Sequence, residues 1–369
     1  MEREELFESV PNFSEGRRHD VIDAIAVAAQ RAYVLDTDAD PDHNRAVISL
    51  AGFRRRLVEG LLAGVGEAVD RIDIRAHSGV HPRVGAADVV PIVPLGSTSL
   101  EECRDLAHEL AELIWTELRV PVFFYGHGEN RSLADIRARR AVPDIGGPAL
   151  HPTAGAVCVG ARAVLVAFNV MLFDTDLVTA RALARSLRES SDGMPGVQAL
   201  IFVLPGNRVQ LSMNLFRLDE TSPDDVLAQL QRLGASMGAE QVVGLCPARA
   251  ANGAAKGRLL EARLAAAAAR EGAKRCEQRG GEELTTLGRR LEREAGELAV
   301  LGVDQDALLA GAERAAALVG VLRAAKVVDS ELESMLVTAS RGFRAAISGG
   351  TEALYRARVA ALDARIAGG

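Results

Sequence analysis

The prolines of this chain stop abruptly about two thirds of the way along. All 13 lie between Pro11 and Pro247, and none occurs after that point. Because proline breaks helices, and because the proline-free part repeats Ala, Leu, Arg and Glu at helical spacing, residues 253–369 are predicted to form an all-helical C-terminal segment. We expect three to five helices there, since glycines break the pattern at a few places. The expected breaks are Gly280-Gly281, a position near Gly302, and Gly349-Gly350.

The part of the chain that contains the prolines alternates strand and helix patterns, and does so twice. The first set has strands expected at 6–13, 33–40, 44–52, 87–95 and 120–126, and helices at 15–32, 54–72 and 99–118. The second set has strands at 163–172, 197–216 around a turn, and 240–247, and helices at 176–190 and 222–238. The fold class predicted is α/β (α+β), with two tandem ferredoxin-like βαββαβ subdomains. The predicted domains are 1–148, 149–252 and 253–369.

The composition of the chain indicates which kinds of molecule it binds and where in the cell it is located. The net charge is -7 and the pI is near 5.6, which argues against a general binder of nucleic acid or of membrane surfaces. The four cysteines show no CxxC pair, so we expect buried, reduced thiols and no structural zinc. The acidic N-terminus lacks the apolar core of a signal peptide, and no uncharged run is long enough to span a membrane. A cytoplasmic protein with a small-molecule partner is predicted.

Two polar clusters stand near the expected strand ends. In VPNFSEG, Asn12 and Ser14 lie where a strand gives way to a helix, a position at which amides and small polar groups meet an anion or a carbonyl; plain N-capping by Ser14 is the alternative. The stretch DTDADPDHNR, 36–45, is either a solvated loop or a ligand-binding segment. An EF-hand calcium loop is excluded because the required glycine and terminal glutamate are missing.

A third cluster, AHSGVHPRVGAADVVP, contains two histidines four residues apart. His77 and His81 would share a helix face and bind zinc, but Gly79 and Pro82 rule out that helix and no third ligand lies nearby. What remains is an imidazole in an irregular loop beside the guanidinium of Arg83, which suits proton transfer next to an anionic substrate. A purely structural histidine is the alternative.

A fourth segment, HPTAGAVCVGARAVLVAFN, is expected to join the two subdomains. Its small residues Gly155, Ala156, Gly160 and Ala161 let a backbone pass close to a flat ligand, and Arg162 adds a donor. The segment lacks the Lys-Ser/Thr of a phosphate-binding P-loop.

Together these segments resemble the formiminotransferase domain of glutamate formiminotransferases, including the first half of the bifunctional formiminotransferase-cyclodeaminase. The matching motifs are VPNFSEG, LDTDADPDHNR, HSGVHPRVGAADVVP, GARAVLVAFNV and VVGLCP, in family order over about residues 6 to 248. The resemblance implies two similar subdomains, commonly in a homodimer, with tetrahydrofolate bound in a cleft between them. It also implies transfer of the formimino group from N-formimino-L-glutamate to N5 of tetrahydrofolate.

The resemblance assigns roles to individual residues. His81 matches the family's catalytic histidine and would shuttle the proton, with Asp38 orienting its imidazole. Arg83 and Arg45 are candidates for binding substrate carboxylates. The predicted catalytic residues are therefore His81, Asp38 and Arg83, and no metal is expected. The predicted substrate and folate contacts are Asn12, Ser14, Asn44, Arg45, His77, Gly155, Ala156, Val157, Cys158, Val159, Gly160, Ala161, Arg162, Ala163 and Val164.

Some positions depart from the family pattern. Met171 stands where asparagine is usual, and Ala239-Glu240 replace a Gly-Ser pair, which bears on donor specificity. The C-terminal helices lack the signature of a cyclodeaminase, so no ammonia-releasing activity is predicted. Three alternatives stay open: a folate-dependent transferase with another formyl or formimino donor, a non-catalytic folate-binding scaffold, and a metal hydrolase that uses His77 and His81.

Overall fold

The structure is a computed structural model that describes residues 5–129, 131–138 and 142–347. The chain forms two compact units. The first comprises Met1–Val164 together with Phe202–Gln210, and the second comprises Leu165–Ile201 and Leu211–Gly369. The short segment Phe202–Gln210 thus belongs to the first unit, although the chain on either side of it belongs to the second.

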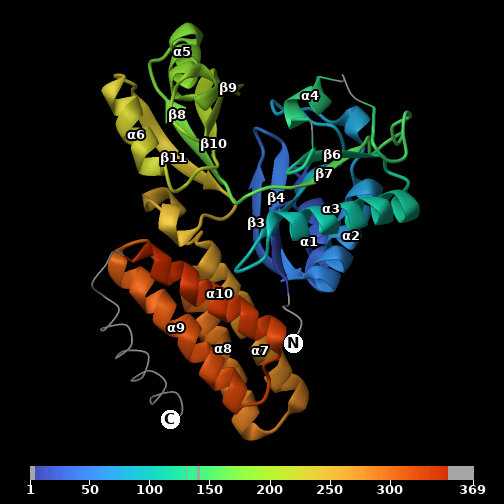
Figure 1. The fold of residues 1–369 in the computed structure, drawn as a ribbon, viewed down its shortest axis with the longest axis vertical. Coiled ribbons are helices and arrows are strands. Elements are labelled where there is room, and N and C mark those ends of the chain that lie inside the picture. The colour runs from blue at the N-terminus through green and yellow to red at the C-terminus, as the bar shows by residue number, and fades with distance from the viewer. Residues whose placement is uncertain (1–4, 130, 139–141, 348–369) are drawn as a thin grey trace. The chain divides into compact units, whose positions relative to one another are not determined.

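The first unit is built on one mixed sheet (Figure 1). Strands β1 and β2 follow one another between β4 and β5 and are antiparallel to both, while β3 pairs with the outer side of β4. Strand β7 lies between β5 and β6 and is parallel to each. The strands are β1 (Leu6–Ser9), β2 (Asn12–Phe13), β3 (Tyr33–Asp40), β4 (Arg45–Phe53), β5 (Ala87–Pro94), β6 (Val122–Gly126) and β7 (Val157–Ala161).

Three helices cover one face of this sheet: α1 (His19–Ala28), α2 (Arg54–Arg71) and α3 (Leu100–Leu113). Their apolar sides pack on alternate strand residues such as Ile48 and Phe124, as the period of two along a strand requires. Neighbouring Phe123 and Tyr125 point the other way and pack with Ile136 of the short helix α4 (Leu133–Arg137). A capping box between Ser99 and Glu102 opens α3. The site described below lies on the face opposite α1–α3.

The second unit begins with a four-stranded sheet in the order β11-β8-β10-β9. Its strands are β8 (Val166–Leu172), β9 (Val197–Leu204), β10 (Arg208–Leu215) and β11 (Met237–Val243), with helices α5 (Leu177–Leu187) and α6 (Pro223–Arg232). Ser222 caps α6 and Pro223 occupies its first position. Helix α6 ends earlier than predicted, because the chain turns at Gly234 with a φ of +74°.

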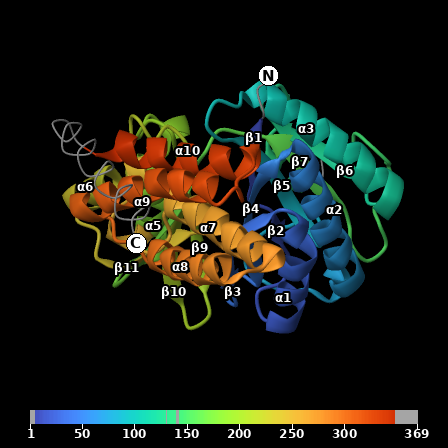
Figure 2. The same ribbon diagram turned by 90° about the horizontal axis from the view of Figure 1, so that it is seen from below.

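Up to residue 347, where the described part of the chain ends, four helices complete the second unit: α7 (Leu260–Arg279), α8 (Glu282–Ala299), α9 (Gln305–Ala324) and α10 (Ser330–Ala346). They lie side by side in Figures 1 and 2, with α7 against α8 and α10. The breaks at Gly280-Gly281 and near Gly302 are confirmed, Gly349-Gly350 lies outside the described residues, and 325–329 form a break that was not predicted. Short 3-10 helices occur at Ala29–Arg31, Ile74–Ala76, Glu189–Ser191, Ala248–Ala250 and Gly253–Ala255, and a π-helix at Ile114–Leu118 continues α3.

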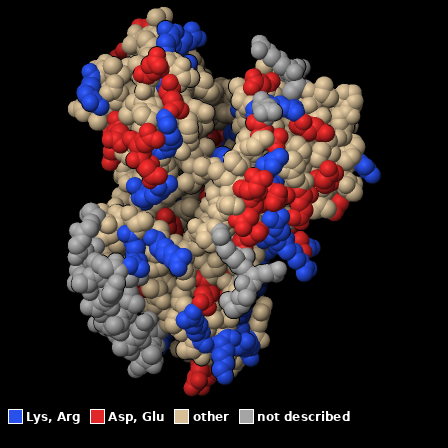
Figure 3. Space-filling model, in the orientation of Figure 1, with Lys and Arg blue, Asp and Glu red and all other residues tan. Residues whose placement is uncertain are grey.

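The mixed α/β class with a helical C-terminal segment is therefore confirmed. The segment 151–169 is more than a connection, however. It contains β7, an interior strand of the first sheet, so the predicted boundary after residue 148 precedes a strand of that sheet. The buried, unpaired cysteines are also as predicted. Among the described helices, none is long and apolar enough to cross a membrane. Acidic and basic side chains occur on both units in Figure 3.

Candidate active site

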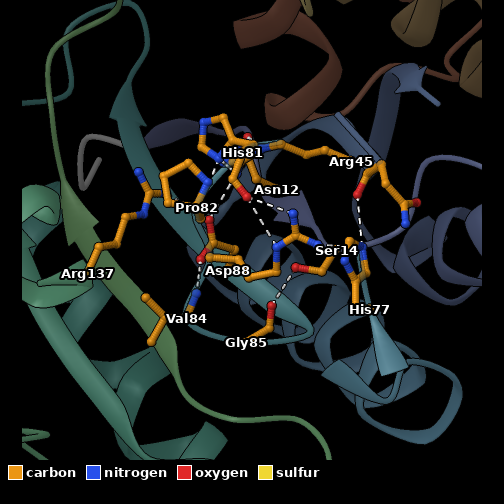
Figure 4. Close-up of polar contacts among 12 residues, drawn as sticks. Asn12, Ser14, Arg45, His77, His81, Pro82, Val84, Gly85, Asp88 and Arg137 are labelled. Carbon is orange, nitrogen blue, oxygen red and sulfur yellow. Dashed lines mark hydrogen bonds and ion pairs between the residues drawn. The ribbon is translucent and has the colours of Figure 1, made fainter. Parts of the chain in front are cut away.

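His81 lies in the loop that leads into β5, and its Nδ1 has two neighbours of opposite character (Figure 4). Nη1 of Arg45 is 2.8 Å away and can only donate, whereas the carbonyl oxygen of Pro82 is 2.7 Å away and can only accept. The two contacts therefore belong to different tautomers. When Nδ1 accepts from Arg45, the proton sits on Nε2; when Nδ1 donates to Pro82, Nε2 carries the lone pair of a base.

The His81 imidazole is held in its neutral form. Burial and the positive charges of Arg45 and Arg137 lower its pKa to about 3, while the Pro82 carbonyl and the Asp88 carboxylate oppose that shift. The free protein therefore has a neutral imidazole at physiological pH. A negative charge bound nearby would raise this pKa and favour protonation of the ring.

Asp88 is the fully buried carboxylate at the centre of the site. It accepts hydrogen bonds from Nη1 of Arg45 at 3.0 Å, from Nη2 of Arg137 at 2.8 Å and from the amide of Val84 at 2.6 Å. Burial disfavours its ionised form, but the two guanidiniums outweigh burial, so its pKa is lowered and it stays charged. Two guanidiniums and one carboxylate leave a net positive charge beside His81.

A β-bulge brings Asp88 into this position. Asn12 pairs with Val89 and Phe13 pairs with Ala87, so Asp88 is the extra residue on β5 and has no partner on β2. Such bulges redirect a side chain. Asn12 then completes the cluster, because its Oδ1 accepts from Nε of Arg45 at 2.8 Å and its Nδ2 donates to the Val10 carbonyl at 2.8 Å.

Arg83 and His77 shape the loop that carries His81. Nη2 of Arg83 donates to the His81 carbonyl at 2.6 Å, and Nη1 lies 2.8 Å from Nε2 of His77. Asn44 binds the same loop by donating from Nδ2 to the Ser78 carbonyl, and its Oδ1 accepts from the Gly16 amide. The structure thus places Arg83 against the backbone of His81, while Arg45 contacts the ring itself.

The hydrogen bonds around Ser14 differ from those expected for a residue that caps a helix. Ser14 does not cap α1: its hydroxyl donates to the Gly85 carbonyl at 2.7 Å and ties β2 to the start of β5. Glu15 occupies the amides instead, since its Oε1 accepts from the backbone of Gly16, Arg17 and Arg18. N-capping by Ser14 is therefore wrong, and the carboxylate of Glu15 already fills the anion position at this helix start.

Asp38 lies on β3 directly across from Val47, which in turn pairs with Asn12. Opposed residues of paired strands point to the same face, so Asp38 lies on the face that carries the site. The carboxylate whose charge raises the pKa of His81 is Asp88. Orientation of the imidazole by Asp38 stays a prediction.

The ten predicted folate contacts from Gly155 to Val164 form β7 and the residues around it. The side chains of this strand are buried, and the close approach allowed by its glycines is to other backbone: a Cβ on Gly160 would lie 1.8 Å from the Tyr125 carbonyl oxygen. Small residues here are thus explained by strand packing. Ala163 is the exposed residue of the segment, and a folate contact stays a prediction.

Four members of the site were not predicted from the sequence. Asp88 had a visible signal, an acidic residue inside the apolar strand ADVVPIVP. Arg137 had none, because it lies in a charged stretch far along the chain. Phe202 and Gln210 come from the tips of β9 and β10: Phe202 stacks on His81, and Oε1 of Gln210 lies 2.8 Å from Nε2 of His43.

The donor set does not suit a cation. No group of three metal-ligating side chains occurs among the described residues. Guanidinium nitrogens lie 2.8 Å from Nε2 of His77 and from Nδ1 of His81, and these would repel a metal ion bound there. This geometry argues against the metal-hydrolase alternative.

Comparison with known proteins identifies the family of this chain. The family described as formiminotransferase domain, N-terminal subdomain, matches residues 6–162. Glutamate formimidoyltransferase of Thermoplasma acidophilum is 36% identical over 300 residues, which cover 71% of this chain and 98% of that protein. The protein of the same name from Streptococcus pyogenes is 34% identical, covering 66% and 90%. Formimidoyltransferase-cyclodeaminase of Rattus norvegicus is 36% identical, covering 67% of this chain and 51% of the relative. The chain therefore belongs to the formiminotransferase family.

Proposed function

We propose that this protein is a glutamate formimidoyltransferase that moves the formimino group from N-formimino-L-glutamate to N5 of tetrahydrofolate, a step of histidine degradation. One observation carries the proposal beyond family membership. His81 is a neutral imidazole whose Nδ1 has both a donor and an acceptor within reach, next to a network with net positive charge. This arrangement suits proton transfer on an anionic amidine substrate.

The chemistry requires one proton to change nitrogen. N5 of tetrahydrofolate attacks the amidine carbon, and a tetrahedral intermediate forms. N5 then loses a proton and the glutamate nitrogen gains one, so the carbon–glutamate nitrogen bond breaks and 5-formimino-tetrahydrofolate remains. In the tautomer whose Nδ1–H donates to Pro82, Nε2 of His81 accepts the first proton and returns it to the leaving nitrogen.

Arg45, Arg137 and Arg83 are the candidates for the substrate carboxylates. Nε of Arg137 is buried and reaches no hydrogen-bond acceptor within the described part of the chain, so this guanidinium retains donor capacity for a ligand. A carboxylate bound there would offset the positive charge that lowers the His81 pKa. The substrate would then raise the basicity of the group that acts on it.

Tetrahydrofolate is the proposed co-substrate, with Arg162, Ala163 and Val164 at the end of β7 as its contacts in that segment. For His77, Asn12 and Asn44, hydrogen bonds within the loops support an organising role beside the ligand.

We also propose a cytoplasmic homodimer without cyclodeaminase activity. Strand order supports a ferredoxin-like βαββαβ repeat in each unit, since β5-β1/β2-β4-β3 and β11-β8-β10-β9 place the four strands alike.

The test is a direct assay. Purified protein is mixed with tetrahydrofolate and N-formimino-L-glutamate, and acid converts the product to the absorbing methenyl form. We expect activity in the wild type, a loss of about 100-fold or more in His81→Gln, and a smaller loss in the matched variant His77→Gln. Turnover of a formyl or another formimino donor in place of this one would select the alternative transferase. Folate binding without turnover of any donor would select the scaffold.

A further inference from the structure

The imidazole of His81 has an aromatic neighbour from a distant part of the chain. The ring of Phe202, at the tip of β9, is stacked on it with centroids 5.7 Å apart and planes 26° from parallel. The same phenyl ring presents an edge-to-face contact to His43, at 4.9 Å and 81°. These contacts lie within the first unit, to which Phe202–Gln210 belongs. Phe202 therefore packs against both His81 and His43.

Polar contacts fix this hairpin tip in place. Gln210 is 4% exposed and His43 is 7% exposed, and Nε2 of His43 donates to Oε1 of Gln210 at 2.8 Å. Arg208 forms an ion pair with Asp42, in the turn that also carries His43. Burial of an amide and an imidazole is favourable only while this hydrogen bond holds, so the tip has one preferred position.

The surroundings of His81 show what Phe202 adds. The charged groups that face the imidazole are Arg45, Arg137 and Asp88, and the neighbouring titratable group is His43, whose ring centroid is 6.2 Å away. Arg45 and the Pro82 carbonyl both contact Nδ1. No hydrogen bond from the described residues reaches Nε2. Phe202 thus covers a face of the ring while the edge bearing Nε2 is left for a ligand.

We propose that Phe202 is a positioning residue for His81: it covers one face of the imidazole and holds the ring so that Nε2 points at the reacting nitrogens, with the His43–Gln210 hydrogen bond fixing Phe202. The consequence for turnover rests on the proposed function, but the ring contact does not. The segment Phe202–Gln210 of the first unit thereby contributes to the chemistry through His81 without touching the substrate. Removal of the Phe202 ring is expected to lower kcat more than it changes KM.

The variants separate packing from position. Phe202→Ala removes the ring, Phe202→Leu keeps an apolar side chain of similar reach, and Val203→Ala is the control, since Val203 is the next residue on β9 and is 42% exposed. The full-length protein is labelled with 15N-histidine, and His81→Gln assigns the His81 signals. The pKa of His81 and its tautomer are then read from pH titrations by NMR, without any substrate.

We expect Phe202→Ala to raise the pKa of His81 by about one unit or more, because water replaces the phenyl ring. Phe202→Leu should retain most of the wild-type value and Val203→Ala all of it. In the transfer assay, kcat of Phe202→Ala should fall about 10- to 100-fold with KM changed less than about threefold. An unchanged pKa and tautomer in Phe202→Ala would overturn the proposal, and so would an unchanged kcat. If the pKa moves as expected but the wild type transfers no formimino group, the ring contact stands and the proposed function fails. Should the alanine variant not fold, the leucine variant and Gln210→Met, which releases His43, carry the same test.

Discussion

The Asp88 carboxylate accepts a hydrogen bond from Nη2 of Arg137 at 2.8 Å, although the two residues are 49 positions apart in the chain. Asp88 also binds Arg45, which contacts His81. One buried carboxylate therefore fixes both guanidiniums of the site and, through one of them, the imidazole.

Asp88→Asn keeps the shape of the side chain and removes its charge. The two guanidiniums then lack their buried counter-charge, so the free energy of unfolding should fall by about 3–5 kcal/mol. Because Arg45 loses its anchor, kcat/KM for formimino transfer should fall about 100-fold. Denaturant unfolding and steady-state kinetics measure the two effects, with Asp105→Asn on the exposed side of α3 as the control. Wild-type stability in Asp88→Asn would contradict this account of the network.

The low pKa of His81 predicts that activity falls at different acidic pH values in the profiles of kcat/KM and of kcat. The pH profile of kcat/KM reports the free enzyme, in which burial and two guanidiniums lower this pKa to about 3, so activity should persist below about pH 5. The profile of kcat reports the substrate complex, in which bound carboxylates offset the arginine charge and raise the pKa. The acid limb of kcat should therefore lie at higher pH than that of kcat/KM. Coincident limbs would show that the substrate carboxylates bind elsewhere.

The same imidazole links stability to pH. Its pKa in the folded protein is below the ordinary value of 6.5, so the unfolded state binds the proton first as the pH falls. The contribution to stability is complete above 6.5 and is lost progressively towards pH 3. The wild type should thus lose more stability than His81→Gln when both are unfolded at pH 7 and then at pH 4.5. Parallel losses in the two proteins would contradict this linkage.

Two glycine-to-alanine substitutions should change the free energy of unfolding in opposite directions. In Gly160→Ala the new Cβ would lie 1.8 Å from the Tyr125 carbonyl oxygen, so β6 and β7 must separate, and a loss of more than about 4 kcal/mol is expected. In Gly296→Ala, in the last turn of α8, the new Cβ meets nothing within 4 Å. Since alanine favours a helix interior, that variant should gain about 0.5–1 kcal/mol. Thermal unfolding of both variants beside the wild type measures this.

A buried carboxyl group in the helical segment predicts the reverse pH dependence. Glu261 on α7 is 7% exposed, and burial raises its pKa to about 7 although the Ala248 amide donates to it at 2.8 Å. A raised pKa means that the folded state holds the proton, so this contribution is present below about 4.5 and is lost as the pH rises to 7. Glu261→Gln should therefore be more stable than the wild type at pH 8, by about 1–3 kcal/mol, with little difference at pH 5. Glu277→Gln, exposed on the same helix, is the control, and equal melting temperatures at pH 8 would contradict the prediction.

The sequence predicts those parts of the fold whose signals are local. Strands β3 and β4 follow from two strand-like stretches on either side of an Asp/Pro-rich connection, the starts of α3 and α6 follow from Ser99 and Ser222 as caps, and the break at Gly280-Gly281 follows from the glycines. It does not predict β7, because VCVGA has the small residues of a ligand loop and its strand character comes from two parallel neighbours. Parallel pairing between segments far apart leaves no short-range pattern.

The same distinction applies to the site. His81, Arg45 and Asn12 can be predicted as site residues from the sequence alone, because their motifs are rich in polar residues where a strand or loop ends. The partners that define their chemistry lie far away in sequence: Arg137 in a charged helix and Phe202 in an ordinary apolar strand. Nothing in the residues around Arg137 or Phe202 distinguishes them from solvated or core positions. Assigning them requires the tertiary fold.

The position of β7 between β5 and β6 has a consequence during synthesis. β6 ends at Gly126, but the strand that joins it to the rest of the sheet does not leave the ribosome until residues 157–161 have been made. The aromatic partner of His81 emerges later still, at residue 202. Until β7 has been made, the growing chain exposes an unpaired edge of β5. Nascent chains that stall before residue 157 should therefore be the ones that engage chaperones.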